Sequence, residues 1–137
     1  MNEEMREIIK NQPYVVIATL SPNGLPHLIV VEDKWIIDDE LLVFGRWQMH
    51  QTGQNLRKNP LTIVLGVDTA KRRSIRFFGR GKFVKRKGLK LNKKADRFDE
   101  FLVVKVHRIQ FGQWGSDSNT DFAFDHHYAF DHEKESE

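Results

Sequence analysis

The 137-residue sequence contains no cysteine. That absence excludes disulfides, zinc–thiolate sites, iron–sulfur clusters and thiol nucleophiles together. Long apolar runs are also missing, because stretches such as Tyr14–Leu20 are far too short to cross a bilayer. The segment MNEEMREIIKN carries acids and no long apolar core, unlike a secretory signal. We therefore expect a soluble cytoplasmic protein without a membrane partner.

Several catalytic signatures are absent as well. The sequence has no Walker-type phosphate loop, no Rossmann glycine fingerprint and no nucleophile motif. These absences argue against a kinase, a classical dehydrogenase and a hydrolase. The histidines near the C-terminus, His126, His127 and His132, lack the spacing of a zinc site, so we expect no metal.

Charge is distributed unevenly along the chain. Twelve Lys or Arg residues and no acid occur between Lys71 and Lys94, whereas Ser116–Glu137 holds seven acids and one Lys. These blocks suggest a basic surface for an anionic partner, or a tail that folds back onto the basic face, or simply two solvated faces. Steering of an anionic cofactor explains the basic block as well as nucleic acid does, and we do not expect a nucleic-acid partner.

The hydrophobic pattern predicts a chain that is mostly β-strand. A helix is expected over residues 2–11, because Met5, Ile8 and Ile9 form an i, i+3, i+4 stripe. The β-branched and aromatic runs predict the strands Tyr14–Leu20, Leu25–Glu32, Lys34–Ile37, Leu41–Phe44, Leu61–Val67, Ser74–Lys87 and Glu100–Phe111. This β-rich α+β pattern, with glycines at 79 and 81 inside one strand, favours a barrel.

Two further helices and a C-terminal arm complete the expectation. A short amphipathic helix should precede Asn59-Pro60, and Gly88–Phe98 allows another because Leu91, Ala95 and Phe98 lie at helical spacing. We place one domain at residues 1–111 and an arm at 112–137. The arm is expected to be extended and partly docked, with Glu133–Glu137 frayed.

The stretch Phe44–Pro60 (FGRWQMHQTGQNLRKNP) carries the clearest chemistry. It reads as a strand end, a glycine, a polar loop and a helix start, where free backbone N–H groups can bind an anion. The residues themselves leave two interpretations open: an anion site built with Thr52 and Arg46, or an ordinary polar loop in which Thr52 caps the helix.

Three motifs in this order resemble the FMN-binding split β-barrel family, which has the pyridoxamine 5′-phosphate oxidase-like fold. They are Gly24-Leu25-Pro26, the segment from Met49-His50-Gln51-Thr52 to Asn59-Pro60, and the Gly79-x-Gly81 strand. The resemblance covers roughly residues 5–111 and is strongest to the small stand-alone FMN-binding proteins of the family. It implies a Greek-key split barrel with short helices, and a homodimer with one FMN in each of two interface grooves.

The resemblance also implies which residues bind the cofactor. The isoalloxazine and ribityl chain would lie along Ile29, Val30, Val31, Glu32, Phe44, Gly45, Arg46, Trp47 and Gln48. Met49, His50, Gln51 and Thr52 would hold the phosphate. True pyridoxamine-phosphate oxidases place Lys or Arg near Thr52 and carry a C-terminal substrate motif that QWGSDSNTDF lacks, which argues against vitamin B6 oxidation.

These implications favour an FMN-dependent oxidoreductase that acts on a small molecule, with NAD(P)H as one possible donor. No catalytic residue is assigned. The alternatives on the same fold are a non-catalytic FMN-binding electron carrier, a deazaflavin protein, and a haem binder with an exposed ligand such as His107.

Overall fold

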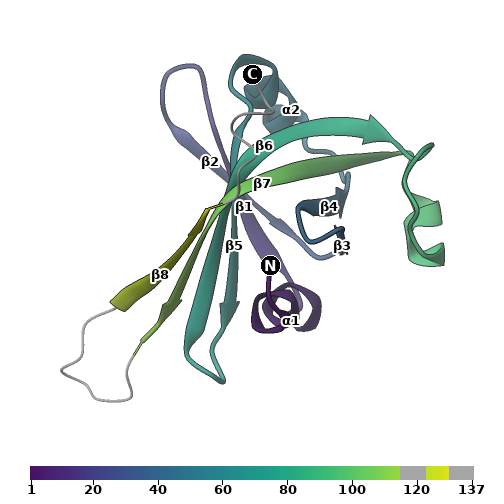
Figure 1. The fold of residues 1–137 in the computed structure, drawn as a ribbon. Coiled ribbons are helices and arrows are strands. Elements are labelled where there is room, and N and C mark those ends of the chain that lie inside the picture. The colour runs from purple at the N-terminus through teal and green to yellow at the C-terminus, as the bar shows by residue number, and fades with distance from the viewer. Residues whose placement is uncertain (115–122, 130–137) are drawn as a thin grey trace.

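The computed structural model describes residues 1–114 and 123–129. Within that part of the chain, short helical elements are combined with eight strands (Figure 1). The elements are α1 (Glu3–Asn11), β1 (Val15–Leu20), β2 (Pro26–Val31), β3 (Lys34–Ile37), β4 (Leu41–Gly45), α2 (His50–Lys58), β5 (Leu61–Asp68), β6 (Arg73–Lys85), the 3₁₀ helix η1 (Lys93–Arg97), β7 (Glu100–Gln113) and β8 (Ala123–Ala129).

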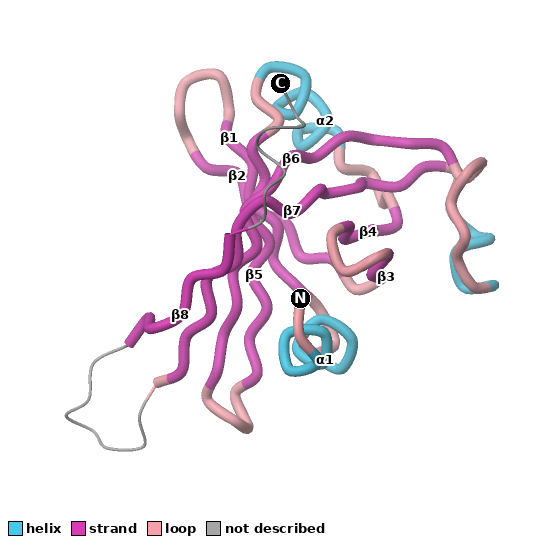
Figure 2. The backbone as a smooth tube through the Cα atoms, in the orientation of Figure 1, coloured by secondary structure: helices cyan, strands magenta, loops and turns pink. Residues whose placement is uncertain are grey.

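The strands form one antiparallel sheet in the order β2-β1-β5-β6-β7-β4-β3, and β8 adds to the free edge of β7. Hydrogen bonding does not join β2 to β3 in the described residues, so the sheet curves without closing. This arrangement confirms the expected mostly-β split barrel with short helices. Figure 2 shows the strands as one curved sheet with α2 near one end and α1 near the other. Residues of β2 and Gly45 at the end of β4, which are distant in sheet order, line the same cavity.

A bulge in the longest ladder divides the sheet into two parts. Strands β6 and β7 pair along their whole length, but the register shifts between Phe78 and Gly79, where His107 is the extra residue on β7. On one side of the bulge β7 pairs with β8, and on the other side it pairs with β4. Only glycine fits at position 79, because a Cβ there would overlap the backbone carbonyl of Lys105.

Two apolar clusters pack on opposite faces of strands β4 and β7. The larger one lies between α1 and the barrel strands and includes the fully buried Ile8, Phe44 and Phe77. The smaller one contains Val43, Ala95, Phe98, Phe101 and Val103 and lies under η1. Phe44 and Val43 are neighbours in sequence and point into different clusters, as strand alternation requires.

The prediction of a helix over Gly88–Phe98 is wrong for most of that range. Only η1 is helical, and the preceding residues form a loop. Gly88 has a positive φ of 94°, and the Arg86 guanidinium donates hydrogen bonds to the carbonyl oxygens of Leu89 and Leu91. These carbonyls therefore accept bonds from a side chain where a helix would use backbone N–H groups.

The C-terminal arm contains a strand that the sequence pattern did not predict. β8 extends the sheet along Arg108–Gln113 of β7, and β7 itself continues two residues past the predicted end at Phe111. The predicted fraying of Glu133–Glu137 concerns residues outside the described part of the chain. His132, one of the histidines considered for a metal site, also lies outside it. The described helices include none with the length and apolar character needed to span a membrane.

An ion cluster ties α1 to the β5–β6 turn. Arg73, which is 6% exposed, donates from Nε to Asp68 Oδ2 at 3.0 Å and from Nη1 to Glu4 Oε1 at 2.9 Å. Burial alone would raise the pKa of Asp68, but the Lys71 backbone N–H and the Arg73 guanidinium outweigh it and lower that pKa below its ordinary value. The charged form of Asp68 is therefore the one that the fold stabilises.

We expect Arg73→Leu to lower the free energy of unfolding by about 3–5 kcal/mol near neutral pH, because it leaves the Asp68 carboxylate buried without its cation. Chemical denaturation measures this difference. The exposed neighbour provides the control, since Lys71→Leu should change stability by less than about 0.5 kcal/mol.

The Asp68–Arg73 pair also makes the free energy of unfolding depend on pH, and the direction follows from the pKa of Asp68. Because folding lowers the pKa of Asp68, its ionised carboxylate stabilises the fold at any pH above the pKa that Asp68 has in the unfolded chain. This stabilisation is lost as the pH falls through the lower pKa of Asp68 in the folded protein. In Arg73→Leu burial raises the pKa of Asp68, so the variant protonates this carboxyl at a higher pH than wild type does. The difference in unfolding free energy should therefore narrow as the pH falls from neutral into the acid range. A difference that is constant from pH 7 to pH 3 would contradict this assignment.

Candidate functional site

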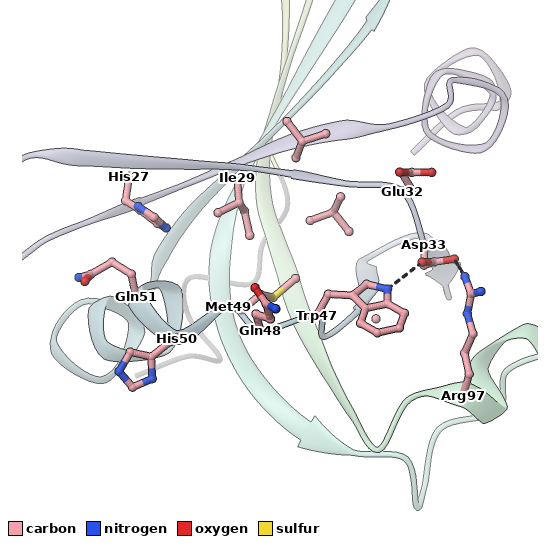
Figure 3. Close-up of a pocket in the computed structure, with 13 residues that line it drawn as sticks. His27, Ile29, Glu32, Asp33, Trp47, Gln48, Met49, His50, Gln51 and Arg97 are labelled. Atoms are coloured by element: carbon pink, nitrogen blue, oxygen red, sulfur yellow. Dashed lines mark hydrogen bonds and ion pairs between the residues drawn. The ribbon is translucent and has the colours of Figure 1, made fainter.

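A cavity of about 620 Å³ lies between β2, the β4–α2 connection and η1. Figure 3 shows His27, His50 and Gln51 at one end, Glu32, Asp33 and Arg97 at the other, and Trp47 beside Asp33. The structure brings most of the predicted cofactor residues together here. Those that line the cavity are Ile29, Val30, Val31, Glu32, Gly45, Trp47, Gln48, Met49, His50 and Gln51.

Three predicted residues do not line the cavity. Phe44 is fully buried in the larger core cluster, behind the cavity wall. Arg46 donates from Nη1 to Glu100 Oε1 at 3.1 Å, and its guanidinium carbon lies 4.0 Å from the centre of the Phe83 ring. Thr52 is completely buried in the first turn of α2.

The start of α2 has the geometry of an anion site. Gln48 and Met49 both have positive φ, at 60° and 35°, which is a costly conformation for residues with side chains. No side chain caps the helix, so the first backbone N–H groups lack a cap partner. The Oγ1 atom of Thr52 is buried and has no hydrogen-bond partner. A ligand with acceptor oxygens in the cavity would complete the uncapped backbone donors.

A chain of amide and hydroxyl groups, buried at Asn55 and Thr19, fixes this helix to the sheet. Gln51 Nε2 donates to Asn55 Oδ1 at 2.8 Å, and Asn55 Nδ2 donates to Thr19 Oγ1 of β1 at 3.0 Å. Asn55 is fully buried and Thr19 nearly so. Because these contacts are satisfied and enclosed, they hold the first turn of α2 in a fixed position beside β2.

Aromatic packing forms the opposite end of the cavity. Trp47 is 60% exposed, yet its Nε1 donates to Asp33 Oδ2 at 3.3 Å, and its ring meets Phe98 edge-on at 5.2 Å. The other Asp33 oxygen pairs with Arg97 of η1. Gly45 leaves room for this packing, because a Cβ there would stand 2.5 Å from the Phe98 ring. An exposed indole held in this way offers a flat wall to a planar ligand.

Sequence reasoning missed three lining residues: His27, Asp33 and Arg97. His27 shares a strand face with Ile29 and Val31, so the alternation of β2 could have found it. Asp33 directly follows the predicted strand end at Glu32 and belongs to none of the motifs. Arg97 carries no local signal, since it reaches the cavity only through the folding of the η1 loop. His107, the candidate haem ligand, is not among the residues that line this cavity.

The cavity combines different chemistries along its length. The α2 end offers uncapped N–H groups, the His50 imidazole and the Gln51 amide, whereas the β2 wall is apolar through Ile29 and Val30. Across the described residues, no cluster of three or more His, Asp or Glu side chains could hold a metal ion. The donor set therefore suits an organic ligand with an anionic end and a planar body.

Comparison with solved structures shows the same fold in several proteins. The tagged HupZ protein of Group A Streptococcus is 21% identical, with a TM-score of 0.71 over 87% of this chain and 99% of that one. A Clostridium acetobutylicum protein related to general stress protein 26, of the pyridoxinephosphate oxidase family, is 13% identical, with a TM-score of 0.71 over 93% of both chains. An FMN-binding protein from Syntrophomonas wolfei is 19% identical, with a TM-score of 0.62 over 80% of this chain and 84% of that one.

Comparison at the level of sequence gives the family. No curated protein sequence matches the chain. The family profile described as pyridoxamine 5′-phosphate oxidase matches residues 1–113, which includes every strand that contributes to the cavity. The order of motifs, the open split barrel and this match agree, and the chain belongs to the pyridoxamine 5′-phosphate oxidase family.

Proposed function

We propose that the chain binds FMN in this cavity and acts as an FMN-dependent oxidoreductase on a small molecule. The observation that carries the proposal is the uncapped start of α2, where His50 and Gln51 line the cavity, placed beside an apolar strand and an exposed indole. A volume of about 620 Å³ lies within the range of sites for cofactors of this size.

The residues fit FMN in a defined order along the cavity. The phosphate would bind at the α2 end, where His50, Gln51 and the backbone N–H groups lie. The ring system would lie along Ile29–Glu32 with Trp47 as the facing wall. When bound, the flavin supplies hydride and electron transfer, and the side chains position it and exclude water.

The outer face of the sheet supports a homodimer as the working form. Leu28 and Val30 of the edge strand β2 are each 64% exposed, and the register places them beside Ala18 and Val16 of β1. The same row continues to Ile63 and Leu65 of β5. A continuous apolar face of this kind suits a second copy of the chain, and it adjoins the cavity at Val30.

Purified protein mixed with FMN and passed through ultrafiltration should retain about one FMN per chain, with the flavin absorption bands. NAD(P)H oxidation by the loaded protein then distinguishes an enzyme from an electron carrier. Protein that remains colourless after this treatment would contradict the FMN assignment.

Combining Thr52→Ala with His50→Ala should weaken FMN binding at least about tenfold, or about 1.4 kcal/mol, because it removes the His50 imidazole from the phosphate end of the cavity and the Thr52 hydroxyl from the first turn of α2. The free protein should lose no stability, since Thr52→Ala removes a buried hydroxyl that has no partner. Fluorescence titration and thermal melts measure the two effects. Arg57→Ala on the exposed end of α2 is the matched control, and unchanged affinity in the double variant would refute the phosphate site.

Leu28→Glu should convert the dimer to a monomer, because it places a charge in the apolar face of β2 without touching the cavity lining. Light scattering coupled to size exclusion gives the mass. Leu25→Glu, in the exposed hairpin turn, introduces the same charge outside the strand rows. A Leu28→Glu variant that keeps the dimer mass would exclude this face.

A further inference from the structure

A polar cavity of about 400 Å³ adjoins the proposed flavin cavity. The two cavities share Glu32 and Asp33, the residues between β2 and β3, so they meet at that corner. Figure 3 shows this corner at the end of the flavin cavity away from His50. We call the polar cavity the lysine pocket, because four of its lining residues are lysines, namely Lys10, Lys34, Lys90 and Lys94.

The four lysines come from segments that only the folded chain brings together. Lys10 lies in the last turn of α1, and Lys34 begins β3. Lys90 precedes η1, and Lys94 lies within it. A single solvated helix face does not account for this grouping, because the cations converge on one cavity from separate elements.

Side-chain contacts fix the wall of the pocket that carries Lys90 and Lys94. Trp35 Nε1 of β3 donates to Asn92 Oδ1 at 3.0 Å, which ties the connection before η1 to the sheet. The Arg86 guanidinium, which donates to the carbonyl oxygens on either side of Lys90, holds the same connection from within. The two lysines therefore project from a wall of defined shape.

Positive charge exceeds negative charge in the lysine pocket. Among the described residues, none of the four lysines makes an ion pair. Of the two carboxylates at the shared corner, Asp33 is already bound by Arg97 and by Trp47 Nε1. Burial lowers the pKa of Lys34 although Asp33 and Glu32 act to raise it. An anion in the pocket would offset this cost.

We propose that the lysine pocket binds the phosphomonoester of the electron donor, so that the donor is the phosphorylated nicotinamide dinucleotide, NADPH, and not NADH. The inference rests on the proposed FMN-dependent function. A phosphomonoester carries about two negative charges near neutral pH, so several lysines suit it better than they suit a single carboxylate. Glu32 at the shared corner offers acceptor oxygens to the ribose hydroxyls of such a donor.

The phosphomonoester takes no part in the chemistry. With FMN bound, the nicotinamide gives a hydride to the flavin, and one proton from solvent completes the reduced cofactor. The lysines would act only by holding the donor, so their loss should raise the donor concentration that is needed and leave the maximal rate of hydride transfer unchanged.

Calorimetric titration of the FMN-saturated protein tests binding apart from turnover. Adenosine 2′,5′-bisphosphate should bind at one site per chain, and 5′-AMP, which lacks the 2′-phosphate, at least about tenfold more weakly. Combining Lys90→Ala with Lys94→Ala should remove at least about tenfold of the bisphosphate affinity. Lys87→Ala with Lys93→Ala is the control of equal charge in the same connection but outside the pocket, and should leave the affinity within about twofold.

Mixing the FMN-loaded protein with each donor without oxygen tests the assignment to the donor. The loss of flavin absorbance should reach half its maximal rate at a concentration of NADPH at least about tenfold lower than that of NADH. The Lys90→Ala and Lys94→Ala pair should raise the value for NADPH and leave that for NADH within about twofold.

Several results would overturn the inference. Equal affinity for the two adenosine probes, or equal weakening by the two double variants, would reduce the pocket to diffuse attraction of anions. Flavin reduction by neither donor, or equally by both, would remove the donor assignment. Weaker FMN retention in the Lys90→Ala and Lys94→Ala pair would assign the pocket to the phosphate of the cofactor itself. FMN retention by the unaltered protein reports the proposed function separately, because its loss would contradict that function whatever the probes do.

Discussion

The close approach of β6 and β7 at Gly79 is the constraint on which the rest of the structure depends. There the chain has no room for a Cβ, and one extra residue on β7 shifts the register of the ladder. The shift lets a single long strand pair with β8 on one side and β4 on the other. Without it the ladder would continue straight, and β4 could not bring its C-terminal end to the first turn of α2.

The start of α2 is costly for the free chain to build. Gln48 and Met49 hold left-handed backbone there, and no side chain caps the helix that follows. The strained connection places the uncapped N–H groups beside a cavity that His50 and Gln51 line. A ligand with acceptor oxygens at that end would complete these donors.

The sequence predicted what depends on local pattern. The β-branched runs of Tyr14–Leu20 and Leu61–Val67 and the glycines at 79 and 81 predicted strands that favour a barrel. The family resemblance carried by these motifs and by the stretch before Asn59-Pro60 predicted the split barrel and ten of the lining residues. Prediction from pattern failed where side chains override periodicity. Leu91, Ala95 and Phe98 have helical spacing, yet Arg86 binds the carbonyl oxygens that a helix would use. Arg46 looked like a phosphate ligand, but Glu100, distant in sequence, pairs with it.

The packing of Phe98 against Gly45 and Trp47 has a consequence for how such a protein can diversify. Phe98, at the aromatic end of the cavity, lies in the connection between β6 and β7, whereas the opposite end is built from the first turn of α2 and the strand β2. Insertions or exchanges in that loop could therefore alter the shape of one end and leave the other untouched. One end of the cavity is thus part of the barrel framework, and the other end depends on a connection that can vary. The shape of the site can therefore change without rebuilding the barrel.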